Sequence, residues 1–207
     1  MSQFFSVHPV NPQPRLIKRA AEIVRAGGII VYPTDSCYAL GCHIGDKTAM
    51  ERIRTIRGID ERHHFALVCR DLSELATYAR VDNQQFRLLK ATTPGSYVFI
   101  LEATRELPKR LQHPKRRTIG LRIPDHPVVH ALLAELGEPI LSSTLLLPGD
   151  EMPLTDVQEI RERLERRVDL ILDGGPCGIV PTTVVDLTGP APVVTRAGKG
   201  SLEPFSA

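Results

Sequence analysis

The feature that most constrains the fold is the alternation of short apolar runs with longer amphipathic runs along the chain. Short runs rich in β-branched residues are typical of buried strands, and apolar residues spaced three and four apart are typical of helices. The strand-like runs are 29–32, 65–69, 96–103, 118–124, 139–144, 169–173, 182–188 and 192–196. The helix-like runs are 15–26, 46–57, 71–79, 82–91, 125–137 and 155–167. This interleaving predicts an α/β fold around a mixed sheet.

The absence of a repeat, a low-complexity tract or an obvious linker favours a single domain. A chain of 207 residues is long enough to bury a substantial core. We expect one domain over residues 1–207, with its core at about 13–198. The last two strand-like runs follow each other closely, so we expect them to pair antiparallel.

Several helix ends carry capping signals. Asp46 is expected to cap the second helix, which Gly58 would close. Asp125 is expected to cap the fifth helix. Thr155 and Gln158 have the spacing of a capping box for the sixth.

Composition excludes some classes of protein. No apolar stretch approaches the roughly 18 residues that a membrane helix needs, and the first residues lack the pattern of a signal peptide. We therefore expect a cytoplasmic protein without a membrane partner. The four cysteines form no C-x-x-C pair and have no histidines at zinc-ligand spacing. We expect free thiols and no protein-bound metal.

Positive charge is concentrated in one stretch, although the net charge is only +2. The segment RELPKRLQHPKRRTIGLR, residues 105–122, contains seven Lys and Arg residues against one Glu. A cluster of this density produces a positive local field that attracts anions.

Polar residues stand within or next to the ends of several predicted strands, where a buried core would not accept them. They are Thr34, Asp35, Ser36, Arg122, Ser142, Ser143, Thr144, Thr182, Thr183 and Arg196. Ligand groups gather at strand-to-loop junctions in open α/β sheets. Hydroxyls together with arginines suit an anionic ligand. The alternative is that each Ser or Thr only forms a turn or fills a strand position.

The sequence gives less support to two other kinds of site. The sequence has no G-x-x-x-x-G-K-[ST] phosphate loop, and the glycines of DGGPCG do not have dinucleotide-binding spacing. A Cys-His hydrolase using Cys37, Cys42 and His43 is conceivable. No orienting carboxylate or oxyanion donors can be recognised for it.

Three stretches together carry a resemblance to a known family. YPTDSCYALG at 32–41, GLRIPDHP at 120–127, and PTTVVDLT with VVTRAG at 181–198 resemble the YrdC/YciO family, which includes threonylcarbamoyl-AMP synthases. The chain looks most similar to the YciO branch. The resemblance implies a twisted mixed sheet beside a concave, positively charged cavity. It also implies ATP with magnesium, bicarbonate and L-threonine as ligands, tRNA modification as the process, and double-stranded RNA or tRNA as a partner.

The resemblance also implies roles for individual residues. Thr34 and Ser36 would hold threonine, and Arg122 would meet its carboxylate. The residues along the nucleotide and its phosphates would be Ser143, Thr144, Thr182 and Arg196. Arg57 and Thr144 would be catalytic. The basic stretch would bind RNA through Lys109, Arg110, Lys115, Arg116 and Arg117.

The chain departs from the synthases at two signatures. The Lys-x-Arg signature corresponds to Thr55-Ile56-Arg57, and the Ser-x-Asn signature to Thr144-Leu145-Leu146. The Lys and the Asn are therefore missing, which predicts weak synthase activity or none. Cations that would partly replace them are Arg54, Arg62, His63 and His64. The alternative is that these four form a solvated surface.

Three functional hypotheses follow. The first is a nucleotide-binding and double-stranded-RNA-binding protein with weak or lost synthase activity. The second is an active threonylcarbamoyl-AMP synthase, a nucleotidyltransferase. The third is an unrelated hydrolase.

Overall fold

Ten strands form one continuous mixed sheet in the order β1-β8-β2-β3-β7-β4-β6-β5-β9-β10 in the computed structural model. The structure describes residues 1–60, 63, 65–113 and 115–206. The strands are β1 (Gln3–Ser6), β2 (Ile30–Tyr32), β3 (Ala39–His43), β4 (Ala66–Val68), β5 (Tyr97–Glu102), β6 (Thr118–Arg122), β7 (Ile140–Thr144), β8 (Leu170–Asp173), β9 (Thr183–Asp186) and β10 (Val193–Arg196). The α/β prediction with a mixed sheet is confirmed.

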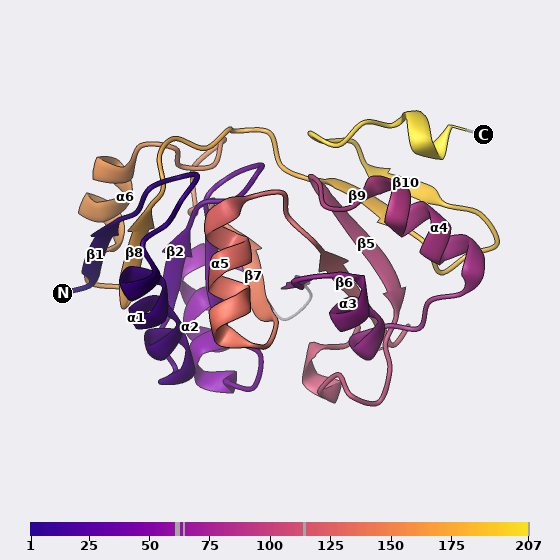
Figure 1. Ribbon diagram of the computed structural model, residues 1–207, viewed down its shortest axis with the longest axis horizontal. Helices are drawn as coiled ribbons and strands as arrows, with labels where there is room; N and C mark the ends of the chain where they lie inside the picture. The colour runs from indigo at the N-terminus through magenta and orange to yellow at the C-terminus, as the bar shows by residue number, and fades with distance from the viewer. Residues whose placement is uncertain (61–62, 64, 114, 207) are drawn as a thin grey trace.

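The described helices are α1 (Pro14–Arg25), α2 (Lys47–Arg57), α3 (Leu72–Tyr78), α4 (Asn83–Thr92), α5 (Pro127–Leu136) and α6 (Val157–Leu164). Two short 3-10 helices are η1 (Lys109–Leu111) and η2 (Glu203–Phe205). Figure 1 shows α1 and α5 side by side in front of the strands on the left, with α3 and α4 beside the strands on the right. No described helix is long and apolar enough to cross a membrane.

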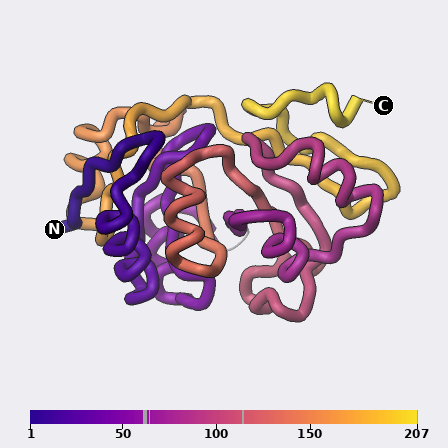
Figure 2. Tube along the Cα trace, in the orientation of Figure 1, coloured from indigo at the N-terminus to yellow at the C-terminus, as the bar shows by residue number. Residues whose placement is uncertain are grey.

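The sheet mixes parallel and antiparallel pairs. β8 pairs in parallel with both β1 and β2, while β3 and β7 run antiparallel to their neighbours. On the other side, β5 runs parallel to β9 and antiparallel to β6. β9 and β10 pair antiparallel, as expected from their close spacing. Segments distant in sequence thus lie next to one another, as the trace in Figure 2 shows for the N-terminal and later strands.

Two groups of buried side chains stabilise this arrangement. One joins α1 and α5 to one face of β2 and β8, through residues such as Val24, Leu132 and Leu170. The other joins α2, α3, α4 and α6 to alternate strand residues such as Leu67 and Phe99. Because successive strand residues point to opposite faces, one strand contributes to both groups.

The expected ends of two helices differ from those observed. Asp46 caps α2 and Gly58 closes it in the left-handed conformation, as predicted. The cap of α5 is His126 instead of Asp125, and that of α6 is Asp156 instead of Thr155. In both cases the side chain one residue nearer the helix reaches the free backbone N–H groups.

Candidate functional site

Most of the predicted site residues line one cavity of about 600 Å³. Its walls come from the end of α2 and from β3, β4, β5, β6, β7, β9 and β10, with the loops between them. The predicted residues that line it are Ser36, Arg57, Arg116, Arg122, Ser143, Thr144, Thr182 and Arg196. This volume is typical of cavities that bind small molecules.

Arg57 reaches the cavity from the last turn of α2. Its Nη1 donates to Ser143 Oγ over 2.6 Å, its Nε donates to the Leu146 carbonyl over 3.0 Å, and Nη1 lies 3.3 Å from His63 Nε2. Burial lowers the pKa of the Arg57 guanidinium, although arginine remains protonated in proteins. Neutral oxygen atoms therefore hold this charge in place.

Arg196 ends β10 and, like Arg57, lines the cavity. Its guanidinium donates to the Thr182 carbonyl at 2.8 and 3.1 Å and to Thr182 Oγ1 at 3.0 Å. Burial lowers its pKa first, and the charge of Arg122 lowers it further. Among the described residues, neither Arg57 nor Arg196 forms an ion pair with a carboxylate.

Arg122 is held differently. It ends β6, where Thr118, Ile119 and Gly120 also line the cavity. Its Nη2 forms an ion pair with Asp35 Oδ1, and both side chains are more than 90% buried. The positive charge of Arg122 is thus balanced within the protein.

The loop after β2 is shaped by Thr34. Its Oγ1 donates to the Cys37 carbonyl over 2.6 Å and accepts from the Ser36 backbone N–H over 3.1 Å. Ser36 and Cys37 line the cavity, whereas Thr34 is not one of the lining residues. Thr34 is therefore a buried turn residue in this structure, and its expected contact with a ligand stays a prediction.

A known family matches most of this chain. The sequence model of the Sua5_yciO_yrdC family, described as Telomere recombination, matches residues 22–198. The chain belongs to this family.

Members of the family differ in how closely they match. The chain is 60% identical to the uncharacterised protein YciO of Escherichia coli over 205 residues, which are 99% of this chain and 100% of that protein. The crystal structure of Escherichia coli YciO has a TM-score of 0.96 and covers 100% of both chains.

More distant members include synthases. The threonylcarbamoyl-AMP synthase of Halorhodospira halophila is 29% identical over 180 residues, 86% of this chain and 93% of that protein. Sua5 of P. abyssi, crystallised with L-threonine, is 25% identical with a TM-score of 0.89, and the match covers 98% of this chain and 59% of that one. The chain is thus related to threonylcarbamoyl-AMP synthases.

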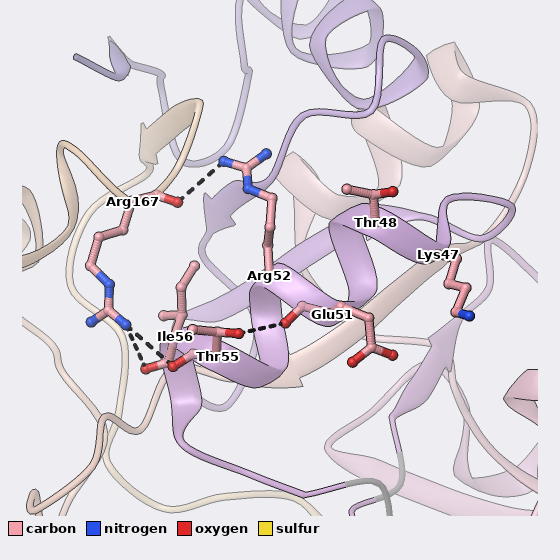
Figure 3. Close-up of a pocket in the computed structure, with 7 residues that line it drawn as sticks. All are labelled: Lys47, Thr48, Glu51, Arg52, Thr55, Ile56 and Arg167. Carbon is pink, nitrogen blue, oxygen red and sulfur yellow. Dashed lines mark hydrogen bonds between the residues drawn. The ribbon is translucent and has the colours of Figure 1, made fainter.

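The first of the two expected departures from the synthases, at Thr55, lies outside the cavity. Thr55 is not one of the cavity-lining residues; with Arg52 and Arg167 it lines a separate surface hollow (Figure 3). Its Oγ1 donates to the Glu51 carbonyl over 3.0 Å. Thr55 precedes Arg57 by two residues in α2. Two residues correspond to a rotation of roughly 200° about the helix axis, so the two side chains lie on different faces. Thr55 thus does not line the cavity in this structure, and its correspondence with the lysine of the synthases stays a prediction.

The second expected departure from the synthases, at Leu146, lies in the cavity. Leu146 lines the cavity and is half-buried there, next to Arg57. Among the substitute cations, Arg54 pairs with Glu51 and lies 5.5 Å from the centre of the Phe65 ring, outside the cavity lining. His63 does line the cavity. Arg62 and His64 lie outside the described residues.

The basic stretch divides into residues with different environments. Lys109, Lys115 and Arg117 are exposed, and Arg116 both lines the cavity and lies 3.8 Å from Asp186. Arg110 donates to the carbonyls of the turn before α2, Ile44 at 3.2 Å and Gly45 at 2.7 Å. Its guanidinium therefore joins two parts of the fold.

The thiols do not form the alternative hydrolase site. Cys42 is fully buried, and His43 Nε2 is 2.8 Å from Glu138 Oε1 at the far end of β3 from Cys37. Cys37 lines the cavity, but burial raises the pKa of its thiol against the opposing effect of Arg122, Lys199 and Arg196. A protonated thiol is a poor nucleophile. Within the described ranges, no cluster of His, Cys, Asp or Glu is placed to hold a metal ion.

Sequence reasoning missed several cavity residues. They are His113, Glu151, Met152, Pro153 and Ile179. All lie outside the named helices and strands, where no periodicity or capping signal marks a side chain as facing inward. The sequence shows Asp35 as a polar residue at a strand end, but its pairing with Arg122 depends on the approach of two segments far apart in sequence.

Proposed function

We propose that the cavity binds ATP and L-threonine, and that the chain forms threonylcarbamoyl-AMP slowly or not at all. The observation that carries this proposal is the pair of guanidinium groups, Arg57 and Arg196, that face the cavity without a carboxylate partner among the described residues. Guanidinium groups fixed by neutral acceptors suit phosphate oxygens, because their charge is not cancelled within the protein.

The rest of the lining fits the same ligands. Hydroxyls at Ser36, Ser143 and Thr182 supply short hydrogen-bonding groups, and apolar side chains such as Val98 and Ile100 supply a surface for a base. In this proposal magnesium binds together with ATP, because Mg²⁺ is commonly coordinated by substrate phosphates and water.

The low rate follows from Leu146. An apolar side chain at this cavity position neither donates a hydrogen bond nor stabilises developing negative charge. Loss of one such donor lowers a rate by roughly a hundredfold or more. Binding is retained in this proposal because the arginines remain.

Ligand binding is tested by the melting temperature of the protein with increasing MgATP. We expect the melting temperature to rise with ATP concentration. Arg57→Gln should abolish most of the rise, while Arg54→Gln, which alters a neighbouring arginine outside the cavity lining, should preserve it. No rise for the unmodified protein at millimolar ATP would contradict nucleotide binding.

Catalysis is tested separately by pyrophosphate release in the presence of ATP, bicarbonate and L-threonine. We expect release that is slow or absent in a protein that binds ATP. Fast release would favour the second hypothesis, an active synthase in tRNA modification, and would show that Arg57 and its neighbours are sufficient.

Binding of double-stranded RNA or tRNA is a second candidate function. It is supported by the exposed side chains of Lys109, Lys115 and Arg117 next to Arg116, which also lines the cavity. Exposed Lys and Arg side chains bind duplex RNA mainly through its phosphates.

A further inference from the structure

Basic side chains also gather in the surface hollow drawn in Figure 3, named here the α2 hollow. It has a volume of about 650 Å³ and shares no lining residue with the cavity. Its lining comes from α2 and from the segment between α6 and β8, namely Lys47, Thr48, Glu51, Arg52, Thr55, Ile56 and Arg167.

Two arginines of the α2 hollow are held in place by hydrogen bonds, three of which are drawn in Figure 3. Arg52 donates to Asp169 Oδ2 over 3.0 Å and to the Arg167 carbonyl over 3.3 Å. Arg167 Nη2 donates to the carbonyls of Thr55 and Ile56, both over 3.3 Å. Because the two guanidinium groups are already ordered, a ligand that contacts them loses little affinity to side-chain ordering.

The α2 hollow has positive charge that the fold does not balance. Among the described residues, Glu51 is the one carboxylate that lines the hollow, and it pairs with Arg54 at 2.6 Å. Arg52 is balanced by its aspartate. Lys47 and Arg167 form no ion pair with a carboxylate in the described part of the chain. Their two charges are therefore available to an anionic partner.

These two charges are too far apart for one small anion. Lys47 is the first residue of α2, and Arg167 is bonded to the last turn of the same helix. Nine residues of α-helix correspond to about 13 Å along the axis. Figure 3 shows the two side chains at opposite ends of the helix. A polymer with regularly repeated negative charges can contact both.

The basic stretch of residues 105–122 meets the same helix at its start. Arg110 Nη2 donates to the carbonyls of Ile44 and Gly45, and Gly45 is two residues before Lys47. Lys109, beside Arg110, is exposed. Positive side chains therefore continue from the basic stretch, past Lys47, to the far end of the α2 hollow.

We propose that duplex RNA binds along the α2 hollow, with its phosphates on the basic stretch, on Lys47 and on Arg167, and outside the cavity. This inference rests on the second candidate function, the binding of duplex RNA. Phosphates recur along each strand with one charge apiece, and guanidinium groups bind them through paired N–H donors. Because the RNA does not enter the cavity, RNA and MgATP bind independently.

Lys47→Glu tests the α2 hollow without weakening the helix. Lys47 is exposed and stands at the N-terminus of α2, where the helix dipole favours a carboxylate over an ammonium group. Lys18→Glu is the matched control, since it makes the same change of charge at another exposed helical lysine. Lys18 belongs to α1, which packs on the other face of the sheet from α2.

The measurement is filter binding of a labelled RNA duplex at several salt concentrations, with and without saturating MgATP. We expect Lys47→Glu to weaken binding by about tenfold or more in about 50 mM salt, and to reduce the slope of log affinity against log salt by about one. Lys18→Glu and MgATP should each change the affinity by no more than about twofold. Unchanged binding by Lys47→Glu, or equal losses in the two variants, overturns the proposal. Displacement of RNA by MgATP also overturns it, because it places the RNA in the cavity.

Arg167→Gln tests the other end of the hollow, and its melting temperature shows whether the lost contacts to α2 affect the fold. We expect a loss of RNA affinity that adds to that of Lys47→Glu, because the two sites are far apart. Poly-L-glutamate that displaces RNA at equal charge concentration overturns the assignment to RNA and indicates an acidic protein segment. RNA binding that depends on the basic stretch but not on Lys47 or Arg167 overturns this inference alone. No binding of duplex RNA by the unmodified protein refutes the second candidate function and this inference with it.

Discussion

At the scale of single residues, the three cavity arginines differ in what holds them. Arg57 and Arg196 are fixed by hydroxyl and carbonyl oxygens, and Arg122 is fixed by a carboxylate. Two of the three positive charges therefore remain available to an anionic ligand. The sequence puts Arg57 and Arg196 at the ends of predicted elements and Arg122 within a predicted strand, but it does not indicate which of them has a carboxylate partner.

The substitution Leu146→Asn belongs to this scale. It places an amide donor in the cavity next to Arg57. We expect pyrophosphate release with ATP, bicarbonate and L-threonine to increase by about tenfold or more. Leu146→Met, which conserves volume but adds no donor, should not increase the rate.

Thr55→Lys gives the complementary comparison. Because Thr55 faces the other hollow, a lysine there should add nothing to the rate, alone or together with Leu146→Asn. A gain from Thr55→Lys would show that the side chain at this position does reach the cavity. No gain from Leu146→Asn in a folded, ATP-binding protein would mean that the cavity has diverged at other positions too.

At the scale of elements, the pattern of the sequence predicts the long helices and most strands to within a few residues. Strands β1 and β3 are the main omissions. β1 consists of only four residues, Gln3–Ser6, none of which is fully buried. Its local sequence therefore carries little of the apolar pattern that predicts a strand, and its pairing with β8 depends on a segment far away in the chain. β3 contains Gly41, which weakens the β-branched pattern typical of a strand.

Gly58 links an element boundary to the site, because it ends α2 directly after Arg57. Its φ is +61°, and an added Cβ would lie 2.7 Å from Pro148 Cγ. Gly137 ends α5 with φ +75° and nothing within 4 Å of an added Cβ. Gly137→Ala should therefore cost about 1 kcal/mol of unfolding free energy, and Gly58→Ala distinctly more. Urea unfolding measures both, and equal losses would show that Pro148 yields without cost.

His126 should make stability depend on pH at the start of α5. Its Nδ1 accepts from the Val128 backbone N–H over 3.2 Å, which requires that nitrogen to be unprotonated. Burial lowers its pKa from 6.5, although Asp35 and Asp125 oppose the shift. As pH falls below about 6.5, the unfolded chain takes up this proton before the folded protein does, so the unfolding free energy decreases.

The comparison of wild type with His126→Asn isolates this effect. Asparagine keeps a capping acceptor but does not titrate. We expect a flatter dependence of the urea midpoint on pH between about 7 and 5 in this variant. Identical slopes for the two proteins would mean that His126 takes up its proton equally in both states.

At the scale of the whole molecule, the fold brings Ser36, Arg57, Arg122, Ser143, Thr182 and Arg196 from separate elements to one cavity. The sequence predicts that these residues share one site, because polar residues at strand ends gather at one edge of a sheet. The loop residues of the cavity were not predictable, since their positions depend on how the loops fold back. Roles for all of these residues remain predictions.

RNA binding is a property of the exposed surface, so its test removes charge from that surface without loosening the fold. The variant changes Lys109, Lys115, Arg116 and Arg117 to Ser and keeps Arg110, which holds the turn before α2. We expect it to lose most of its affinity for duplex RNA and to show a flatter dependence of affinity on salt.

The matched control removes the same charge from other exposed positions. These are Arg15, Lys18, Arg87 and Lys90, each changed to Ser. Filter binding at several salt concentrations should separate the two variants. Equal losses of affinity would indicate attraction by net charge only, and no loss in either variant would place RNA binding on another surface or exclude it.

The position of β8 between β1 and β2 has a consequence for biosynthesis. Residues 3–6 and 30–31 pair with residues 170–173, which leave the ribosome much later. At about 5–20 residues per second, the first strands wait on the order of ten seconds for their partner. During this interval the strand edges that later pair with β8 are open to other nascent chains or to a chaperone. We expect nascent chains arrested before residue 170 to remain sensitive to protease at the N-terminal strands, and longer ones to become resistant.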